Sequence, residues 1–257
     1  HQIVRDYTRE AGCRNLERTI GAVLRNVAVR IAEGSLTQKT IEVEDLQSIL
    51  GAPRFENEVA MRTSVPGVAT GLAWTPVGGD ILFIESTRVP GNGKLILTGQ
   101  LGDVMKESAQ IALSFLRSHG AELELPVADL KDRGVHIHFP AGAVPKDGPS
   151  AGITLTTALA SLLSGRLVRT DVAMTGEVSL TGRVLPIGGL KQKLLAAHRA
   201  GITTVVIPQR NEADLDDVPA EVLDTLEVHP VTDVRQVLEI ALAPASAPAE
   251  RRIPAAA

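Results

Sequence analysis

Apolar side chains recur at helical spacing through the N-terminal part of the chain. They stand three and four positions apart, at Leu16, Ile20, Val23, Leu24, Val27 and Ile31. Gly34 follows them as a helix stop signal. We therefore expect a helical module over residues 1–52, and the polar, proline-bearing stretch over residues 53–67 is typical of a linker.

From Val68 onward the pattern changes to short runs typical of strands. The first runs are GVATGLAWTPV, DILFIESTRV and KLILTG, and the turns VGGD and PGNG between them predict two hairpin-like connections in succession. Later helices are predicted at residues 102–118, PSAGITLTTALASLL, GLKQKLLAAHRA and residues 234–242, alternating with strands such as GVHIHF, TTVVIP and TLEVHPV. This order predicts an α+β domain with local α/β alternation over residues 68–243, followed by an alanine- and proline-rich tail, residues 244–257, that we expect to be disordered.

Composition narrows the class of protein. The chain has 257 residues, of which 44% are apolar, and can bury a sizeable core. Lys and Arg number 26 against 30 Asp and Glu, and the net charge of -4 disfavours general binding to nucleic acid. The single cysteine, Cys13, excludes an intrachain disulfide and a paired-cysteine zinc site, which favours a reducing, cytoplasmic compartment. No apolar run is long enough to span a membrane, and the start without methionine predicts a fragment of a longer protein.

The stretch PKDGPSAG, residues 145–152, stands between a predicted strand and a predicted helix. Pro149 suits the first turn of a helix, where its missing N–H costs nothing, and Asp147 or Gly148 can serve as the N-cap. Ser150 would then lie in that first turn, where unpaired backbone N–H groups could hold the developing oxyanion of a carbonyl beside its hydroxyl. An ordinary helix start explains the same letters, and the short motif alone favours this simpler interpretation.

A serine nucleophile needs a base, for which histidines, carboxylates and lysines are the candidates. In GGLKQKLLAAHRAG the apolar stripe runs through Leu190, Leu194 and Ala197, so Lys193 borders the buried face at about 50° from its centre. Lys191 is about 110° away and should be solvated. Partial burial lowers the pKa of a lysine from about 10.4, as a base near neutral pH requires. The alternative is that Lys193 extends its charge into water.

These stretches resemble the C-terminal part of the bacterial Lon protease family, ATP-dependent serine proteases with a Ser-Lys dyad. The resemblance rests on PKDGPSAG, MTGEVSLTGRVLPIGGLKQKLLAAHRAG, TGLAWTPVGGD and YTREAGCRNLER, and it covers about residues 3–242. It implies a small helical AAA+ α-domain over residues 1–52 and a proteolytic domain over residues 68–243, whose α+β fold is similar to a domain of a ribosomal protein. It also implies that Ser150 is the nucleophile and Lys193 the general base.

Further positions match residues around the dyad of the family. Thr175, in MTGE, matches a threonine that hydrogen-bonds the lysine amine, with an ordinary strand-end threonine as the alternative. Asp147, Glu177, His136 and His138 match positions close to the dyad, where acidic groups could tune the pKa of the lysine. The two histidines share one strand face, so packed or hydrogen-bonded polar residues are the favoured interpretation, and the pair alone would bind a metal weakly.

The resemblance also implies where other molecules bind. Substrate lies extended beside a strand edge in the family, and the candidates for lining that groove are Gly71, Leu72, Ala73 and Trp74. Core packing explains Trp74 equally well. Arg14 matches a nucleotide-sensing arginine of the AAA+ α-domain, with a helix-surface arginine as the alternative, and we expect the neighbouring Cys13 to be a small buried residue.

The P-loop pattern GxxxxGK[ST] is missing from the sequence. We therefore expect no cofactor in this chain, with ATP and Mg²⁺ bound by the complete protein. The resemblance implies a serine endopeptidase fragment that cleaves only unfolded polypeptides, from a cytoplasmic, homohexameric protease without a membrane segment or a metal site. Two other classes stay open: a catalytically silent Lon-like scaffold, which Ser150, Lys193 and Thr175 disfavour, and a nucleic-acid-binding module, which the charge and an aromatic content of 2% disfavour.

Overall fold

The computed structural model describes residues 1–8, 10, 12–53, 63–76, 78–91, 93–140 and 145–244. Most of the predicted linker lies outside the described residues, and so does the predicted tail from residue 245 onward. The chain forms two compact units, His1–Glu58 with Thr75–Gly78, and Val59–Trp74 with Gly79–Ala257. Within the described part of the chain, no helix combines the length and the apolar character that crossing a membrane requires.

The first unit contains the helices α1 (Gln2–Tyr7), α2 (Arg14–Ala32) and α3 (Asp45–Leu50). The helix α2 confirms the predicted periodic segment, and Gly34 ends it with a φ of 74°, a conformation that glycine adopts without strain. Its small core consists of Tyr7, Val23 and Leu46, and the Tyr7 hydroxyl donates a hydrogen bond to the carbonyl oxygen of Gly51 at 3.0 Å.

Cys13 is exposed, so the expectation of a buried cysteine is wrong. It occupies the N-cap of α2, one position before the first helical turn. A residue at the N-cap does not belong to the apolar stripe with which the helix packs against its core. Nearby, the carboxylate of Glu10 accepts hydrogen bonds from the backbone N–H groups of Asn15 and Leu16 at 2.9 and 2.8 Å and so caps the helix in place of a side chain at the N-cap.

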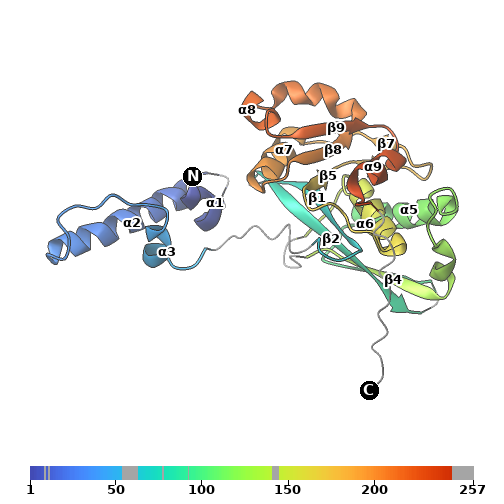
Figure 1. Ribbon diagram of the computed structural model, residues 1–257, viewed down its shortest axis with the longest axis horizontal. Helices are drawn as coiled ribbons and strands as arrows, with labels where there is room; N and C mark the ends of the chain where they lie inside the picture. The colour runs from blue at the N-terminus through green and yellow to red at the C-terminus, as the bar shows by residue number, and fades with distance from the viewer. Residues whose placement is uncertain are drawn as a thin grey trace, which may run out of the picture. The chain divides into compact units, whose positions relative to one another are not determined.

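The second unit contains a seven-stranded mixed sheet in the order β3-β4-β2-β1-β5-β8-β9 (Figure 1). The strands are β1 (Val68–Thr75), β2 (Gly78–Pro90), β3 (Leu95–Thr98), β4 (Arg133–His138), β5 (Val172–Met174), β8 (Thr204–Pro208) and β9 (Glu227–Val231). The strands β1, β5, β8 and β9 run parallel, and β2 pairs antiparallel with β4. A separate antiparallel hairpin joins β6 (Glu177–Val178) to β7 (Val184–Leu185). The predicted mixture of strands and helices is confirmed.

The strands β2 and β3 do not form the second hairpin that the sequence predicted. β4 lies between them in the sheet, and β3 pairs in parallel with β4, Leu95 opposite Val135 and Thr98 opposite His138. The short alternating sequence of β3 and the glycine turn before it predict a strand and a change of chain direction, but they do not specify the neighbouring strand. The partner of the strand depends on residues far away in the sequence, here β4.

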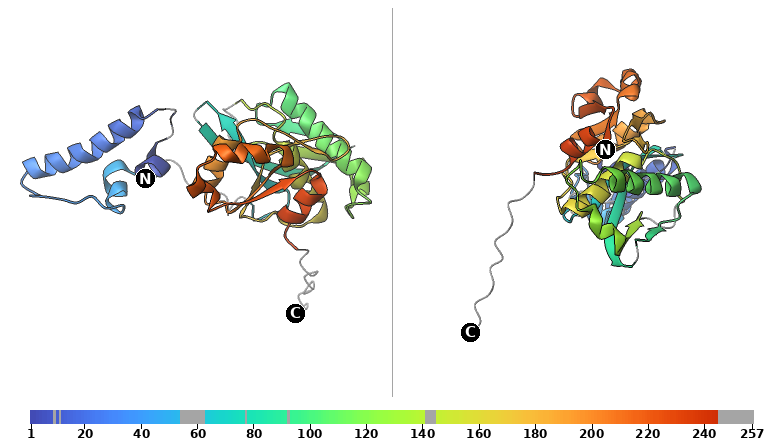
Figure 2. Two further views of the ribbon diagram at one scale, coloured as in Figure 1. Left: turned by 90° about the horizontal axis from the view of Figure 1, so that it is seen from above. Right: turned by 90° about the vertical axis from the view of Figure 1, so that its right-hand side faces the viewer.

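Helices cover both faces of the sheet (Figure 1). They are α5 (Asp103–His119), α6 (Gly152–Ser164), α7 (Leu190–Arg199), α8 (Ala220–Leu223) and α9 (Val234–Ala241), with the 3-10 helices η1 (Val127–Lys131) and η2 (Gln209–Asp217). Neighbouring strand residues point to opposite faces, so Met174 packs with α5, α6 and α9, whereas Ala173 packs with α7 and η2. The right-hand view of Figure 2 shows α5 (green) and α6 (yellow) side by side.

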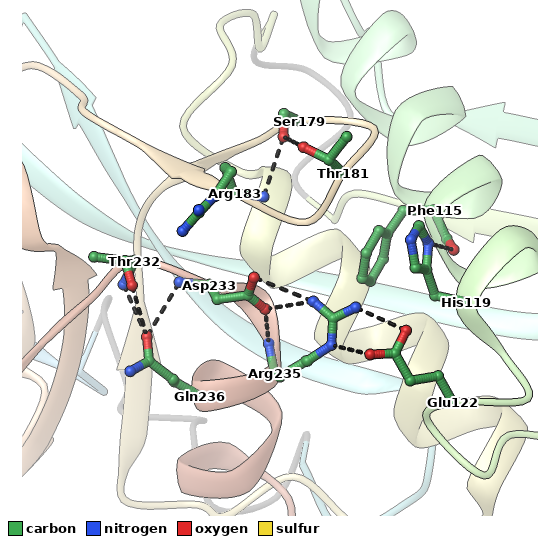
Figure 3. Close-up of polar contacts among 10 residues, drawn as sticks. All are labelled: Phe115, His119, Glu122, Ser179, Thr181, Arg183, Thr232, Asp233, Arg235 and Gln236. Carbon is green, nitrogen blue, oxygen red and sulfur yellow. Dashed lines mark hydrogen bonds and ion pairs between the residues drawn. The ribbon is translucent and has the colours of Figure 1, made fainter.

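An ion-pair network joins the start of α9 to the turn after α5 (Figure 3). The Arg235 guanidinium donates to the Glu122 carboxylate at 3.0 and 2.9 Å and to Asp233 at 2.9 and 3.1 Å. Asp233 also accepts from the backbone N–H of Arg235 in a capping box at the N-terminus of α9. The loop of the β6–β7 hairpin joins the same region, because the backbone N–H of Val234 donates to the carbonyl of Gly182 at 2.8 Å.

Candidate active site

Ser150 lies in the turn that precedes α6. The helix begins at Gly152 with Ala151 as its N-cap, so the prediction that Pro149 occupies the first helical turn is wrong. The carbonyl oxygen of Ser150 accepts the backbone N–H of Gly176 at 2.9 Å, and this tertiary hydrogen bond takes the place of a bond in the helix ladder. Ser150 itself is half-buried.

Asp147 caps a different helix from the expected one. Its Oδ1 accepts the backbone N–H of Met105, in the first turn of α5, at 3.0 Å and that of Gly148 at 2.9 Å. A carboxylate at this end of a helix satisfies an unpaired N–H group and complements the helix dipole. Asp147 therefore fastens the segment before Ser150 to α5, and the prediction that it caps α6 is wrong. An effect of Asp147 on the lysine pKa stays a prediction.

Lys193 lies in the first turn of α7 and its side chain is buried. It is 2% exposed, whereas Lys191 is exposed, as the helical periodicity predicted. The alternative in which Lys193 extends into water is therefore wrong. Burial lowers the pKa of Lys193 from 10.5 to about 8, because the ammonium form loses its hydration inside the protein. A lysine with this pKa is partly neutral near neutral pH.

Thr175 connects Lys193 to the Ser150 segment. It follows β5 directly and is fully buried. The Lys193 amine donates to Thr175 Oγ1 at 3.0 Å, and the Thr175 hydroxyl donates to the carbonyl oxygen of Ser150 at 3.4 Å. A threonine has one hydroxyl proton, so Thr175 can only accept from the amine while it serves that carbonyl. The lone pair of a neutral Lys193 then stays available for another proton donor.

The described residues show no direct hydrogen bond between the Ser150 hydroxyl and the Lys193 amine; Thr175 links that amine to the backbone carbonyl oxygen of Ser150. Catalytic hydrogen bonds often shorten only when substrate binds, so the missing bond does not count against a serine and a lysine that act together. The backbone N–H groups of Ser150 and Ala151 donate to none of the described residues. No acceptor in the described part of the chain therefore competes for them with a negatively charged oxygen beside the serine.

The four predicted substrate-binding residues belong to β1 and are Gly71, Leu72, Ala73 and Trp74. Gly71 pairs with Met174, the last residue of β5, so the remainder of β1 extends past the end of its neighbour. Leu72 is buried in the core beside α7, and Ala73 is half-buried. Trp74 is 58% exposed and lies against Gly189, where an added Cβ would come within 3.1 Å of the indole ring. Core packing of Trp74 is therefore wrong.

His136 and His138 lie on β4, with β2 and β1 between that strand and β5. The Thr98 hydroxyl is hydrogen-bonded to Nε2 of His136 at 2.9 Å and to Nδ1 of His138 at 2.7 Å. This agrees with two hydrogen-bonded polar residues on one strand face. The described residues contain no group of three or more His, Cys, Asp or Glu side chains that could hold a metal ion.

Two further predicted residues make no contact with the described part of the chain that assigns their role. Glu177 is half-buried in β6, where it pairs with Leu185 of β7. Arg14 is the exposed first residue of α2. An electrostatic effect of Glu177 on Lys193 and a nucleotide-sensing role of Arg14 therefore stay predictions.

Comparison with known proteins identifies the family. The model of the Lon protease (S16) C-terminal proteolytic domain matches residues 40–244, and that of the Lon protease AAA+ ATPase lid domain matches residues 1–41. The Lon protease of Frankia alni is 68% identical over 249 residues, which cover 95% of this chain and 28% of that protein. The Lon proteases of Methylocella silvestris and Salinispora arenicola are 61% and 60% identical, over 88% and 97% of this chain.

Fold and comparisons together define a serine peptidase domain that follows a helical ATPase lid segment. The chain belongs to the Lon protease family. It spans 28% to 32% of the length of these three relatives. The family models divide the chain near residue 40, within the predicted helical module of residues 1–52.

Sequence reasoning missed Asn211, a buried asparagine of η2 that holds the segment in front of α7. The sequence carries no signal for its role, since Asn211 contacts Ile187, which is distant along the chain.

Proposed function

We propose that the chain is a serine endopeptidase with Ser150 as nucleophile and Lys193 as general base. The buried amine of Lys193 is the observation that carries the proposal. Its pKa is lowered to about 8 and its one described hydrogen-bond partner, Thr175, leaves the lone pair free. Burying an ionisable amine destabilises a fold, and the burial is accounted for when the amine must accept a proton. A catalytically silent scaffold gives no reason for it.

The reaction begins when neutral Lys193 takes the proton from the Ser150 hydroxyl. The Ser150 oxygen forms a bond to the peptide carbonyl carbon, whose oxygen becomes negatively charged and binds the backbone N–H groups of Ser150 and Ala151. The ammonium of Lys193 then gives its proton to the leaving amine as the peptide bond breaks. Water, deprotonated by the same amine, then attacks the acyl carbon; the bond to the Ser150 oxygen breaks, and that oxygen takes the proton back from Lys193 as the second product leaves.

An extended polypeptide is the substrate that fits the end of β1. Residues after Gly71 continue past the end of β5, next to Thr175, so that side of β1 can receive an added strand. Backbone pairing of this kind accepts many sequences and requires a chain that is already unfolded. Exposed Trp74 stands at the far end of the same strand and can contact side chains of the bound segment.

The complete protein, of which this chain matches about a third, would supply the remaining functions. The match to a Lon AAA+ lid supports an ATP- and Mg²⁺-dependent motor in that protein, with Arg14 sensing nucleotide. We propose a homohexameric cytoplasmic protease that unfolds misfolded and regulatory proteins and delivers them to this domain. Without that motor, the 257-residue chain cleaves only unstructured polypeptides.

The test is cleavage of a fluorescently labelled, permanently unfolded protein without ATP. We expect slow cleavage by the wild-type chain and at least about a thousandfold less by Ser150→Ala, because a lost nucleophile removes covalent catalysis. Lys191→Ala is the matched control, since that lysine lies on the same helix and is exposed, and it should retain wild-type activity. Full activity of folded Ser150→Ala would overturn the proposal.

A further inference from the structure

Asn211 makes hydrogen bonds to both backbone groups of one residue, Ile187. Its Oδ1 accepts the N–H of Ile187 at 2.9 Å, and its Nδ2 donates to the carbonyl oxygen of Ile187 at 2.8 Å. The second N–H of Nδ2 donates a hydrogen bond to Asp214 Oδ2 at 2.6 Å. Asn211 is only 4% exposed, so these bonds form in an environment where an unpaired polar group is costly.

Ile187 lies in the segment that leads into α7, directly before two glycines. Gly188 and Gly189 follow it, and Gly189 is the N-cap of α7 with a φ of 70° and without a side-chain cap. Two consecutive glycines leave the backbone many conformations. The side chain of Asn211 fixes both backbone groups of the preceding residue and therefore restricts this freedom.

Lys193 is coupled directly to that segment. Its backbone N–H donates to the carbonyl oxygen of Gly189 at 3.2 Å, which places it one helical turn after the N-cap. A shift of Ile187 and the two glycines would move this turn and, with it, the lysine side chain. The amine must keep its place on Thr175, at 3.0 Å, and its exclusion from water.

We propose that Asn211 is a positioning residue, which holds the start of α7 so that the Lys193 amine stays buried on Thr175. The inference rests on the proposed role of Lys193 as general base. Asn211 does not contact Lys193, and it acts through Ile187 and the helix start. The charged group in contact with Asn211 is Asp214, and the lowered pKa of Lys193 has burial as its cause, without an ion-pair partner among the described residues.

The experiment compares Asn211→Ala with wild type over a pH series, using the unfolded substrate described above and the full chain. Loss of the two bonds to Ile187 admits water to the amine and raises the pKa of Lys193 toward its ordinary value. If the pKa of Lys193 rises by one unit, the fraction of neutral Lys193 near pH 7 falls by about tenfold. We therefore expect kcat to fall about tenfold near pH 7 and KM to change less than about twofold. The midpoint of the rise of kcat with pH should move up by about one pH unit.

Asn211→Asp is the second variant, in case Asn211→Ala does not fold. The carboxylate keeps an acceptor for the Ile187 N–H, but it cannot donate to the Ile187 carbonyl, and it is repelled by Asp214. Asn211→Asp should lower kcat and raise the midpoint, as we expect for Asn211→Ala. Asp214→Asn is the matched control, because it preserves an acceptor for Nδ2 and leaves both bonds to Ile187 intact, and we expect wild-type values.

The outcomes separate this inference from the proposed function. Inactive wild type, or active Ser150→Ala, would reject the dyad itself. An active wild type and inactive Ser150→Ala, with kcat and midpoint unchanged in folded Asn211→Ala or Asn211→Asp, would reject only the role of Asn211. A lower kcat without a shifted midpoint, or a raised KM alone, would also reject it, since either result places Asn211 outside the control of Lys193.

Discussion

Replacing Lys193 by methionine should stabilise the fold while it abolishes proteolysis. Methionine keeps the length and apolar stem of the side chain and removes the amine. In the folded protein the pKa of Lys193 is lowered from 10.5 to about 8 by burial. At about 1.4 kcal/mol for each pH unit, the protonated lysine therefore destabilises the fold by about 3 kcal/mol below pH 8.

Part of this gain is lost with the hydrogen bond to Thr175, which contributes about 1 kcal/mol. We expect Lys193→Met to raise the free energy of unfolding by about 2 kcal/mol near pH 7. The sign depends on pH. Between about pH 8 and about pH 10.5 the unfolded wild type binds more protons than the folded one, so wild-type stability rises with pH and the advantage of the variant disappears.

Urea unfolding near pH 7 and near pH 10, followed by far-ultraviolet circular dichroism, measures both effects. Lys191→Met is the control, because Lys191 is exposed and its replacement should change the free energy of unfolding by less than about 0.5 kcal/mol at either pH. The reasoning fails if Lys193→Met is no more stable than wild type near pH 7. It fails equally if the difference between the two proteins does not shrink at alkaline pH.

Three more changes test contacts around the site. Thr175→Val keeps the shape of the side chain but leaves the buried Lys193 amine without its described partner, so kcat should fall at least about tenfold and the free energy of unfolding by about 1–3 kcal/mol; an unchanged kcat would contradict this role. Gly152→Ala places a Cβ 2.6 Å from the backbone nitrogen of Val178, and we expect a loss of about 1–3 kcal/mol in urea unfolding, whereas wild-type stability would show that the helix start can move freely. Arg235→Gln removes the paired bonds to two carboxylates, and the resulting drop in melting temperature should be smaller at high salt; a salt-independent drop would indicate lost packing instead.

Much of the fold followed from local patterns in the sequence. The helical stripe of α2, the strand runs of β1 and β4, and the periodicity that turned Lys193 inward and Lys191 outward each depend on neighbours within a few positions. The side chain of Lys193 is directed by the helix that carries it, so its position relative to the apolar stripe could be predicted. Its depth of burial could not, because that depends on what packs over the helix.

Tertiary contacts decided what local patterns left open. The start of α6 lies after Ser150 because the Ser150 carbonyl binds the backbone of Gly176. Asp147 caps α5 because the fold brings the N–H of Met105 next to its carboxylate. Likewise, β3 pairs with β4, a strand that is distant in the sequence, because the fold places the two strands side by side. The role of Asn211 could not be predicted from the sequence either, because its partner Ile187 is distant along the chain.

The sequence by itself determined that Lys193 faces inward from its helix and Lys191 outward, and it predicted Ser150 and Thr175 as the partners of Lys193. Only the tertiary structure decided how deeply the Lys193 amine is buried, which group Thr175 binds besides that amine, and which side chain holds the segment before the helix of Lys193. Periodicity acts over a few residues, whereas desolvation and hydrogen bonding depend on every group that the fold brings within a few ångströms.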